Sequence, residues 1–224
     1  MEIKDMLPIW NKLTDEQKNL LERTSSKRKI EKGNLLSSKI NKCIGLVIVE
    51  TGQLRAFIVS ETGREITLCR LFERDIYLLT ASCVLSGIQF EVSLEAEKDT
   101  EYWVIPPDVF QQLMEESVPV SNYTNKLMAS LLSEVMWLID NVMFKSFDSR
   151  LAEFLLEESA NEGGNVLDIT HEKIANHLGS AREVVTRMLK YFQSEGIVKL
   201  SRGKIEINRS IGAMPKASIL KLVK

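Results

Sequence analysis

Four side chains within six residues, Arg182, Glu183, Thr186 and Arg187, have the chemistry to read nucleic-acid bases. Arginine can bond through two donors to the O6/N7 edge of guanine, and glutamate can accept a hydrogen bond from the N4 amine of cytosine. On a helical wheel, at about 100° per residue, they share one side with Lys190, opposite an apolar side. These residue types on one helical face are typical of DNA readout, and an ordinary solvated face is the alternative.

The residues around this face predict a helix-turn-helix over 169–190, in which the second helix enters the major groove. Thr170 is expected to cap the first helix. Ser180 is expected to cap the second, in a capping box with Glu183. Capping and base readout therefore compete for Glu183, and the neighbouring arginines favour readout. His171, where the first helix begins, is either a packing or surface histidine or a phosphate contact.

Two short apolar runs, 197–200 and 204–208, flank a turn that contains Gly203. This pattern predicts a hairpin, which would form the wing of a winged helix. Arg202 would then lie near phosphates, and a solvated turn is the alternative for this residue.

The motif that begins at Thr170, Thr-x-Glu-x-Ile-Ala-x-x-Leu-Gly-x-x-Arg-Glu-x-Val-x-Arg, resembles the DNA-binding signature of the bacterial cAMP receptor protein and fumarate–nitrate regulator (CRP/FNR) family. The resemblance implies that Arg182, Glu183 and Arg187 read bases and that Thr186 lies against the DNA. The Arg-Glu pair resembles the cAMP receptor protein branch and implies a palindromic site with TGTGA-like half-sites. RNA polymerase is a further candidate partner. The full set of candidate DNA contacts is Thr170, His171, Ser180, Arg182, Glu183, Thr186, Arg187, Lys190 and Arg202.

The charge is divided unevenly along the chain. Residues 166–224 hold eleven Lys and Arg against five Asp and Glu, a net charge of +6. The whole chain is −2, so residues 1–165 carry −8. A basic C-terminal module on an acidic body fits local attraction to DNA phosphates and argues against polyanion binding by the whole protein.

At 224 residues the chain is long enough for two modest domains. The sequence has no run of eighteen apolar residues, so it predicts no transmembrane helix. The first residues do not resemble a signal peptide. Three scattered cysteines give no disulfide framework and suit a reducing cytoplasm. We therefore expect a cytoplasmic protein without a membrane partner.

Residues from about 25 to 106 read as many short strands with regular turns, which predicts a barrel or jelly roll. A helix capped by Thr14 is expected over 8–21. The arrangement resembles a cyclic-nucleotide-binding barrel, so the predicted fold is α+β: this barrel, a long dimerisation helix and a winged helix-turn-helix. The expected divisions are 1–113 for the sensor domain, 114–144 for the helix, 145–215 for the DNA-binding domain and 216–224 for a tail.

The stretch after Arg74-Asp75 departs from the cyclic-nucleotide pattern. Cyclic-nucleotide binders place a Glu on the ribose and an Arg on the cyclic phosphate, whereas here Leu79 takes the Glu place and Phe90 the Arg place. We therefore expect no cAMP binding. An apolar effector pocket or a packed loop are the two alternatives, and the candidate pocket residues are Tyr77, Thr80, Ser82, Cys83 and Phe90.

Two other kinds of activity are alternatives for the barrel. A cupin-like metal enzyme would need a histidine cluster, but both histidines lie in the DNA module, so no metal, cofactor or enzymatic activity is expected. A redox signal through Cys83, with Cys43 or Cys69 as a partner, stays open. A protein-interaction module without DNA binding is the remaining alternative.

A long helix is predicted over 118–144, with Pro119 in its first turn. Apolar residues recur along it in steps of four and three, which indicates a heptad seam and a homodimer. The predicted interface residues are Met128, Leu132, Val135, Ile139 and Val142. A second stripe, of Leu127, Leu131 and Leu138, is expected to face the barrel, and a helix buried wholly in its own domain is the alternative.

Overall fold

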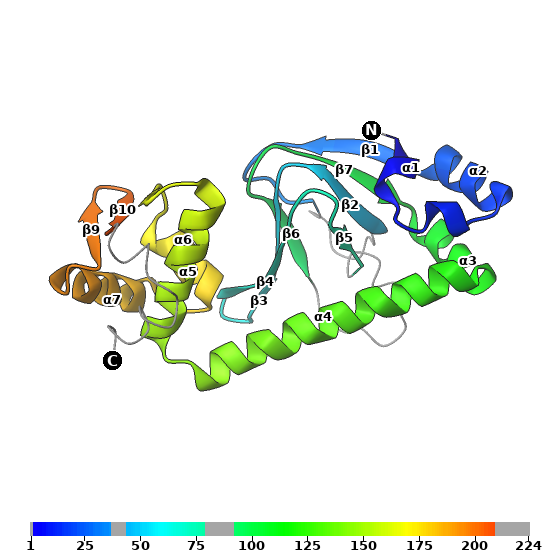
Figure 1. Ribbon diagram of the computed structural model, residues 1–224. Helices are drawn as coiled ribbons and strands as arrows, with labels where there is room; N and C mark the ends of the chain where they lie inside the picture. Colours follow the sequence, from blue (N-terminus) through cyan, green and yellow to red (C-terminus); the bar gives the residue numbers. More distant parts are fainter. Residues whose placement is uncertain (1, 37–43, 79–91, 209–224) are drawn as a thin grey trace. The chain divides into compact units, whose positions relative to one another are not determined.

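The computed structural model describes residues 2–36, 44–78 and 92–208 (Figure 1). The chain divides into two compact units. The first comprises Met1–Val59 and Leu68–Met136, and the second comprises Ser60–Thr67 and Trp137–Lys224. Each unit has its own apolar core, so each is considered by itself.

The first unit begins with short helices. These are α1 (Ile3–Met6), a 3-10 turn (Trp10–Lys12) and α2 (Asp15–Thr24). Thr14 caps α2, because its hydroxyl accepts a hydrogen bond from the Gln17 backbone N–H while the Gln17 side chain bonds back to the Thr14 N–H. The cap was therefore predicted correctly, whereas the single helix over 8–21 was wrong: the chain turns before Thr14 and the helix runs beyond Leu21.

Two antiparallel sheets form the body of the first unit. One has the order β1-β7-β2-β5 and the other the order β4-β3-β6. The strands are β1 (Ser26–Ile30), β2 (Leu46–Thr51), β3 (Leu54–Val59), β4 (Glu65–Leu71), β5 (Ile76–Tyr77), β6 (Ser93–Ala96) and β7 (Thr100–Ile105). The predicted set of short strands is confirmed in outline.

Strand β2 shows why this body needs both sheets and helices. Val47 and Val49 point into a cluster of side chains from both sheets, while Leu46 and Ile48 pack into a second cluster with α2 and α3 (Pro107–Glu116). Because successive side chains alternate between the faces of a strand, a strand covered on both faces reads as a continuous apolar run.

A single helix, α4 (Val118–Phe144), follows α3 with the bounds that the sequence predicts. Leu127 and Leu131 pack against the apolar clusters of the barrel, as expected for the second stripe. Met128, predicted for the dimer seam, also packs there. The exposed apolar side chains further along α4 are Leu132, Met136, Trp137, Ile139, Val142, Met143 and Phe144. Leu132, Ile139 and Val142 belong to the predicted seam, and Leu132, Met136, Ile139 and Met143 form one line in steps of four and three.

By length and composition alone, α4 could also cross a membrane, with 27 residues and a mean hydropathy of 1.4 over its most apolar window. The prediction of no spanning segment rested on unbroken apolar runs, and Lys126, Glu134 and Asp140 interrupt those runs. Charges at the centre of a bilayer cost several kcal/mol, which weighs against insertion.

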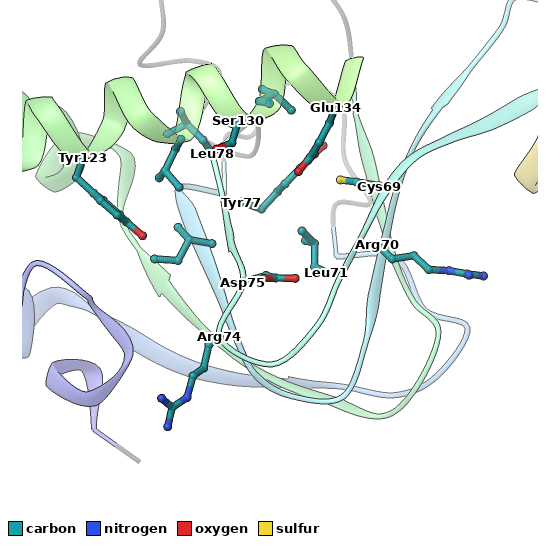
Figure 2. Close-up of a pocket in the computed structure, with 13 residues that line it drawn as sticks. Cys69, Arg70, Leu71, Arg74, Asp75, Tyr77, Leu78, Tyr123, Ser130 and Glu134 are labelled. Atoms are coloured by element: carbon teal, nitrogen blue, oxygen red, sulfur yellow. The ribbon is translucent and has the colours of Figure 1, made fainter. Parts of the chain in front are cut away.

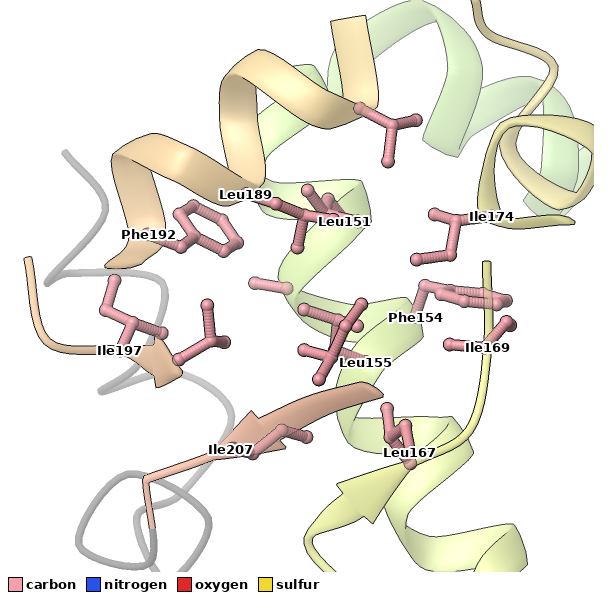
Figure 3. Close-up of a cluster of buried hydrophobic side chains, with 14 of the residues drawn as sticks. Leu151, Phe154, Leu155, Leu167, Ile169, Ile174, Leu189, Phe192, Ile197 and Ile207 are labelled. Atoms are coloured by element: carbon pink, nitrogen blue, oxygen red, sulfur yellow. The ribbon is translucent and has the colours of Figure 1, made fainter. Parts of the chain in front are cut away.

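The second unit is built on α5 (Phe147–Glu162), α6 (His171–Leu178) and α7 (Arg182–Ser194). A small antiparallel sheet, in the order β8-β10-β9, completes it. Its strands are β8 (Val166–Leu167), β9 (Val198–Ser201) and β10 (Lys204–Ile207), so the predicted hairpin is confirmed and β8 adds a strand to it. Figure 3 shows the core that holds helices and sheet together, with Leu151, Ile174, Leu189 and Phe192 fully buried.

Candidate nucleic-acid interface

The turn between α6 and α7 sets the direction of the second helix. The Thr170 hydroxyl accepts a hydrogen bond from the Lys173 backbone N–H at 3.1 Å, so the predicted cap of α6 is present. Gly179 ends α6 in the left-handed region, with φ of 64°. Glycine adopts this conformation without the steric cost of a Cβ, which allows a tight turn into α7.

The predicted cap of α7 is wrong. The N-cap position is Ala181, which has no side-chain oxygen to accept a hydrogen bond, and no side chain caps the helix there. Ser180 lies one residue too early, because its backbone N–H bonds to the Ala175 carbonyl as part of the preceding turn. The capping box with Glu183 is therefore absent, and Glu183 is exposed in the first turn of α7.

Helix α7 has one buried side and one open side. Val185, Leu189 and Phe192 lie in the core of the second unit. The other side lines an open groove formed by Arg182, Glu183, Thr186, Arg187 and Lys190. At thirteen residues the helix is about 20 Å long, and its diameter of about 10–12 Å matches the width of the B-DNA major groove. The predicted readout residues therefore lie together on one surface.

The first turn of α6 touches this surface in two places. His171 Nδ1 and Thr186 Oγ1 are 2.9 Å apart, within hydrogen-bond distance. Glu172 Oε2 and Arg182 Nη1 are 3.7 Å apart, and both side chains are about two-thirds exposed. The first contact orders the Thr186 hydroxyl, whereas an exposed ion pair of this length contributes little to folding and leaves Arg182 available.

The surroundings of His171, at the start of α6, disfavour its protonated, positively charged form. Burial, and then the positive charge of Arg182, lower the pKa of His171. The imidazole is therefore mainly neutral at neutral pH, which suits a hydrogen bond to Thr186 better than attraction to a phosphate.

The wing presents further positive charge. Arg202 and Lys204 are exposed at the turn between β9 and β10, where Gly203 has φ of 75°. The Gln193 side chain accepts a hydrogen bond from the Leu200 backbone N–H and so joins the end of α7 to β9. The wing is thereby held beside the recognition helix, and its charges add to those of the open groove.

In the first unit, a cavity of about 270 Å³ lies between strands β4 and β5 and helix α4 (Figure 2). Tyr77 lines it, as predicted for the effector pocket. The other four candidates, Thr80, Ser82, Cys83 and Phe90, lie outside the described residues. The remaining lining includes Cys69 from β4 and Ser130 and Glu134 from α4, which the sequence pattern did not assign to a pocket. One signal in the sequence could have pointed to Glu134, because its carboxylate interrupts the apolar residues of α4.

The described cysteine is a poor redox sensor. Burial, with a smaller contribution from Glu134, raises the pKa of the Cys69 thiol to about 12. Because the thiolate is the reactive form, only about one thiol in 10⁴ would be reactive at pH 8. Cys43 and Cys83 lie outside the described residues.

We predict that Cys69 resists alkylation. In a Cys43→Ala/Cys83→Ala chain, iodoacetamide at pH 8 should modify the folded protein at least about 100-fold more slowly than the same chain in urea, because the thiolate is scarce. The measurement is the mass increase over time. Equal rates in the folded and unfolded chains would show that the thiol is ionised and accessible.

Among residues 2–36, 44–78 and 92–208, no three His, Cys, Asp or Glu side chains are grouped closely enough to hold a metal ion. The fold and the site together define a winged-helix DNA-binding protein with a cyclic-nucleotide-binding type of barrel. The comparisons with known proteins agree with this class. Residues 149–210 match the Crp-like helix-turn-helix domain, and residues 27–117 match the cyclic nucleotide-binding domain.

The relatives are regulators of transcription. A solved chain from Eubacterium rectale, assigned to the CRP/FNR family, is 52% identical, with 98% of this chain and 99% of that chain covered and a TM-score of 0.91. The "Cyclic AMP receptor protein" of Thermus thermophilus is 25% identical, with 91% and 93% covered. The "Transcriptional activator protein FnrA" of Stutzerimonas stutzeri is 29% identical, with 83% and 78% covered.

The chain belongs to the CRP/FNR family and is a DNA-binding transcription regulator. The predicted family, fold class and function are thereby confirmed, and the regulatory role of the relatives argues against an enzyme.

Proposed function

We propose that the protein is a cytoplasmic homodimer that reads a palindromic DNA site with TGTGA-like half-sites. Arg182, Glu183 and Arg187 would contact base edges, and Thr186 would lie against the DNA. The observation that carries this assignment is the open side of α7, where these four side chains line one groove while the opposite side is buried. Thr170, Ser180, Lys190 and Arg202 would contact or approach the phosphates around them, and His171 would position Thr186 at the DNA.

Each side chain on this face has a distinct task. Arginine can donate two hydrogen bonds to guanine, and glutamate is an acceptor for the cytosine amine. The Ala181 cap leaves Glu183 without a helix-capping role, which supports base readout. Thr186, ordered by His171, would present its methyl group or hydroxyl at a fixed place.

The exposed apolar stripe of α4 supports a dimer. Leu132 and Met143 are 63% and 70% exposed, and Met136 and Ile139 lie between them. An exposed line with heptad spacing is the pattern that a parallel partner helix covers. Leu132 and Ile139 of the predicted seam would lie in the contact, and Val135 and Val142 would border it. A twofold axis along this stripe would present two recognition helices to a palindrome.

The regulatory signal would be a small molecule bound in the first unit, and RNA polymerase would be a further partner. Cyclic AMP is a poor candidate, because Leu79 and Phe90 replace the residues that hold its ribose and phosphate in the family pattern. Cys69 gives a redox signal no support, since its thiol stays protonated.

Selection of bound sequences from random duplexes tests the proposal. We expect enrichment of two TGTGA-like half-sites in inverted orientation, with centres about one helical turn apart, because a twofold dimer places its recognition helices in successive major grooves. Enrichment of single or direct-repeat half-sites would contradict the dimer geometry. Equal recovery of all sequences would contradict base readout.

A further inference from the structure

The cavity of the first unit carries an inference about the kind of ligand that it binds. Its volume of about 270 Å³ equals roughly nine water molecules at ~30 Å³ each, which is room for a small metabolite. Ile76, Leu127 and Leu131 supply apolar walls, and Cys69, Tyr77, Ser130 and Glu134 supply polar groups. A mixed lining of this kind is typical of small-molecule sites.

The two positively charged residues of the lining, Arg70 and Arg74, do not direct their guanidinium groups into this cavity. Arg70 Nε lies 2.7 Å from Glu97 Oε2 and is committed to that ion pair. Arg74 adopts a left-handed backbone conformation, with φ of 72°. Figure 2 shows the side chains of Arg70 and Arg74 directed away from the cavity, while Cys69, Tyr77 and Glu134 point toward it. Neither guanidinium is therefore directed at the position that an anionic ligand would occupy in this cavity.

The amino-acid sequence extends this conclusion beyond the described residues. Residues 75–97 include no Lys, Arg or His. Whichever of them adjoin the cavity, none can neutralise a phosphate or a carboxylate. The charge that a cyclic nucleotide requires is therefore missing from the whole stretch between Arg74 and Lys98.

Glu134 supplies the opposite charge. Within the described part of the chain, no side chain or backbone group donates a hydrogen bond to its carboxylate. Burial, and then the charge of Asp75, raise the pKa of Glu134. The Asp75 carboxylate itself accepts a hydrogen bond from the Phe72 backbone N–H at 2.8 Å and so holds the turn before β5. The Glu134 side chain is exposed, and its carboxylate is an acceptor with which a cationic donor would pair.

We propose that this cavity binds a small organic amine, with its ammonium group on the Glu134 carboxylate and its apolar body against Ile76, Leu127 and Leu131. The ligand class is thus opposite in charge to a cyclic nucleotide. That the amine is the regulatory signal rests on the proposed function. Glu134 lies about 200° around α4 from Leu132, so the ligand and a partner helix would contact opposite sides of the same two turns.

Calorimetric titration with three probes tests the ligand class. Phenethylamine supplies the amine, 3-phenylpropionate supplies a similar apolar body with a carboxylate, and cAMP supplies the cyclic phosphate. We expect phenethylamine to bind most tightly, by about tenfold or more. Tighter binding of either anion, or no binding of phenethylamine at millimolar concentration, would overturn the proposal.

A matched pair of variants locates the contact. Glu134→Gln should weaken phenethylamine binding by about ten- to a hundredfold, because a charge-assisted hydrogen bond contributes about 1.5–3 kcal/mol. Glu73→Gln makes the same change on an exposed residue outside the lining and should leave the affinity unchanged. Equal affinity of Glu134→Gln and the unsubstituted chain would contradict the assignment.

Binding of the unsubstituted chain to duplex DNA separates this inference from the proposed function. Specific DNA binding without amine binding overturns the ligand class alone. Amine binding without DNA binding at any site overturns the proposed function and leaves the cavity assignment standing.

Discussion

Replacing Arg182 by alanine should lower the affinity of the dimer for its palindromic site by about 2–6 kcal/mol, from about 1–3 kcal/mol at each of two half-sites. The guanidinium would otherwise bond to two acceptors on one guanine, and alanine leaves them unpaired. The preference for guanine at one base pair of each half-site should be relaxed at the same time. Competition binding against duplexes with single base changes measures both effects.

The structure separates this loss from a folding defect. In the free protein the partner of Arg182 is Glu172, at 3.7 Å and largely exposed, so its removal should barely change the thermal midpoint. Glu172→Ala is the matched control, because it removes the same ion pair and keeps the arginine. We expect its DNA affinity to be unchanged or slightly higher.

Lys190 provides a second comparison on the same face. Lys190→Ala should weaken binding to all sequences similarly and reduce the salt slope by about one, as expected for a phosphate contact. A selectivity profile for Arg182→Ala that matches the unsubstituted protein would contradict its role in base readout.

Placing glutamates at Leu132 and Ile139 should convert the dimer to a monomer. Both side chains are exposed in the single chain, at 63% and 41%, so the substitutions should leave the fold intact. In a dimer they would place like charges in an apolar contact, which opposes association. Sedimentation velocity at micromolar concentration measures the expected change in mass.

The loss of the dimer should also lower the affinity for a palindrome by about 10²–10⁴-fold, because binding of one DNA-binding domain gives the second, linked domain a high effective concentration at the other half-site. Affinity for one half-site should change little. Ser133→Glu is the matched control, since Ser133 is exposed about 100° around the helix from Leu132. A double variant that stays dimeric would show that the interface lies elsewhere.

Much of the helix-turn-helix could be predicted because the sequence signals for it are local. The Thr170 cap and the spacing of Arg182, Glu183, Thr186 and Arg187 depend on residues a few positions apart. The first and last residues of the long helix α4 could be predicted for the same reason. The error at Ser180 shows the limit of such rules, since the turn uses its backbone N–H and moves the N-cap to Ala181.

The cavity could not be predicted in the same way. Its lining joins β4 and β5 with residues of α4 that lie 46 to 65 positions later, and no sequence spacing relates Cys69 to Glu134. Leu132 and Ile139 of the exposed line of α4 were predicted from the heptad spacing, whereas the inward packing of Met128 and the exposure of Met136 and Met143 required the structure. Contacts between distant segments decide both features.

Selection from random duplexes with the purified dimer tests the central claim most directly. The account predicts inverted TGTGA-like half-sites whose guanine preference is lost at one position in Arg182→Ala and retained in Glu172→Ala. Recovery of the same motif with Arg182→Ala, or of no motif with the unsubstituted chain, would contradict the assignment of the α7 face as the reader of the site.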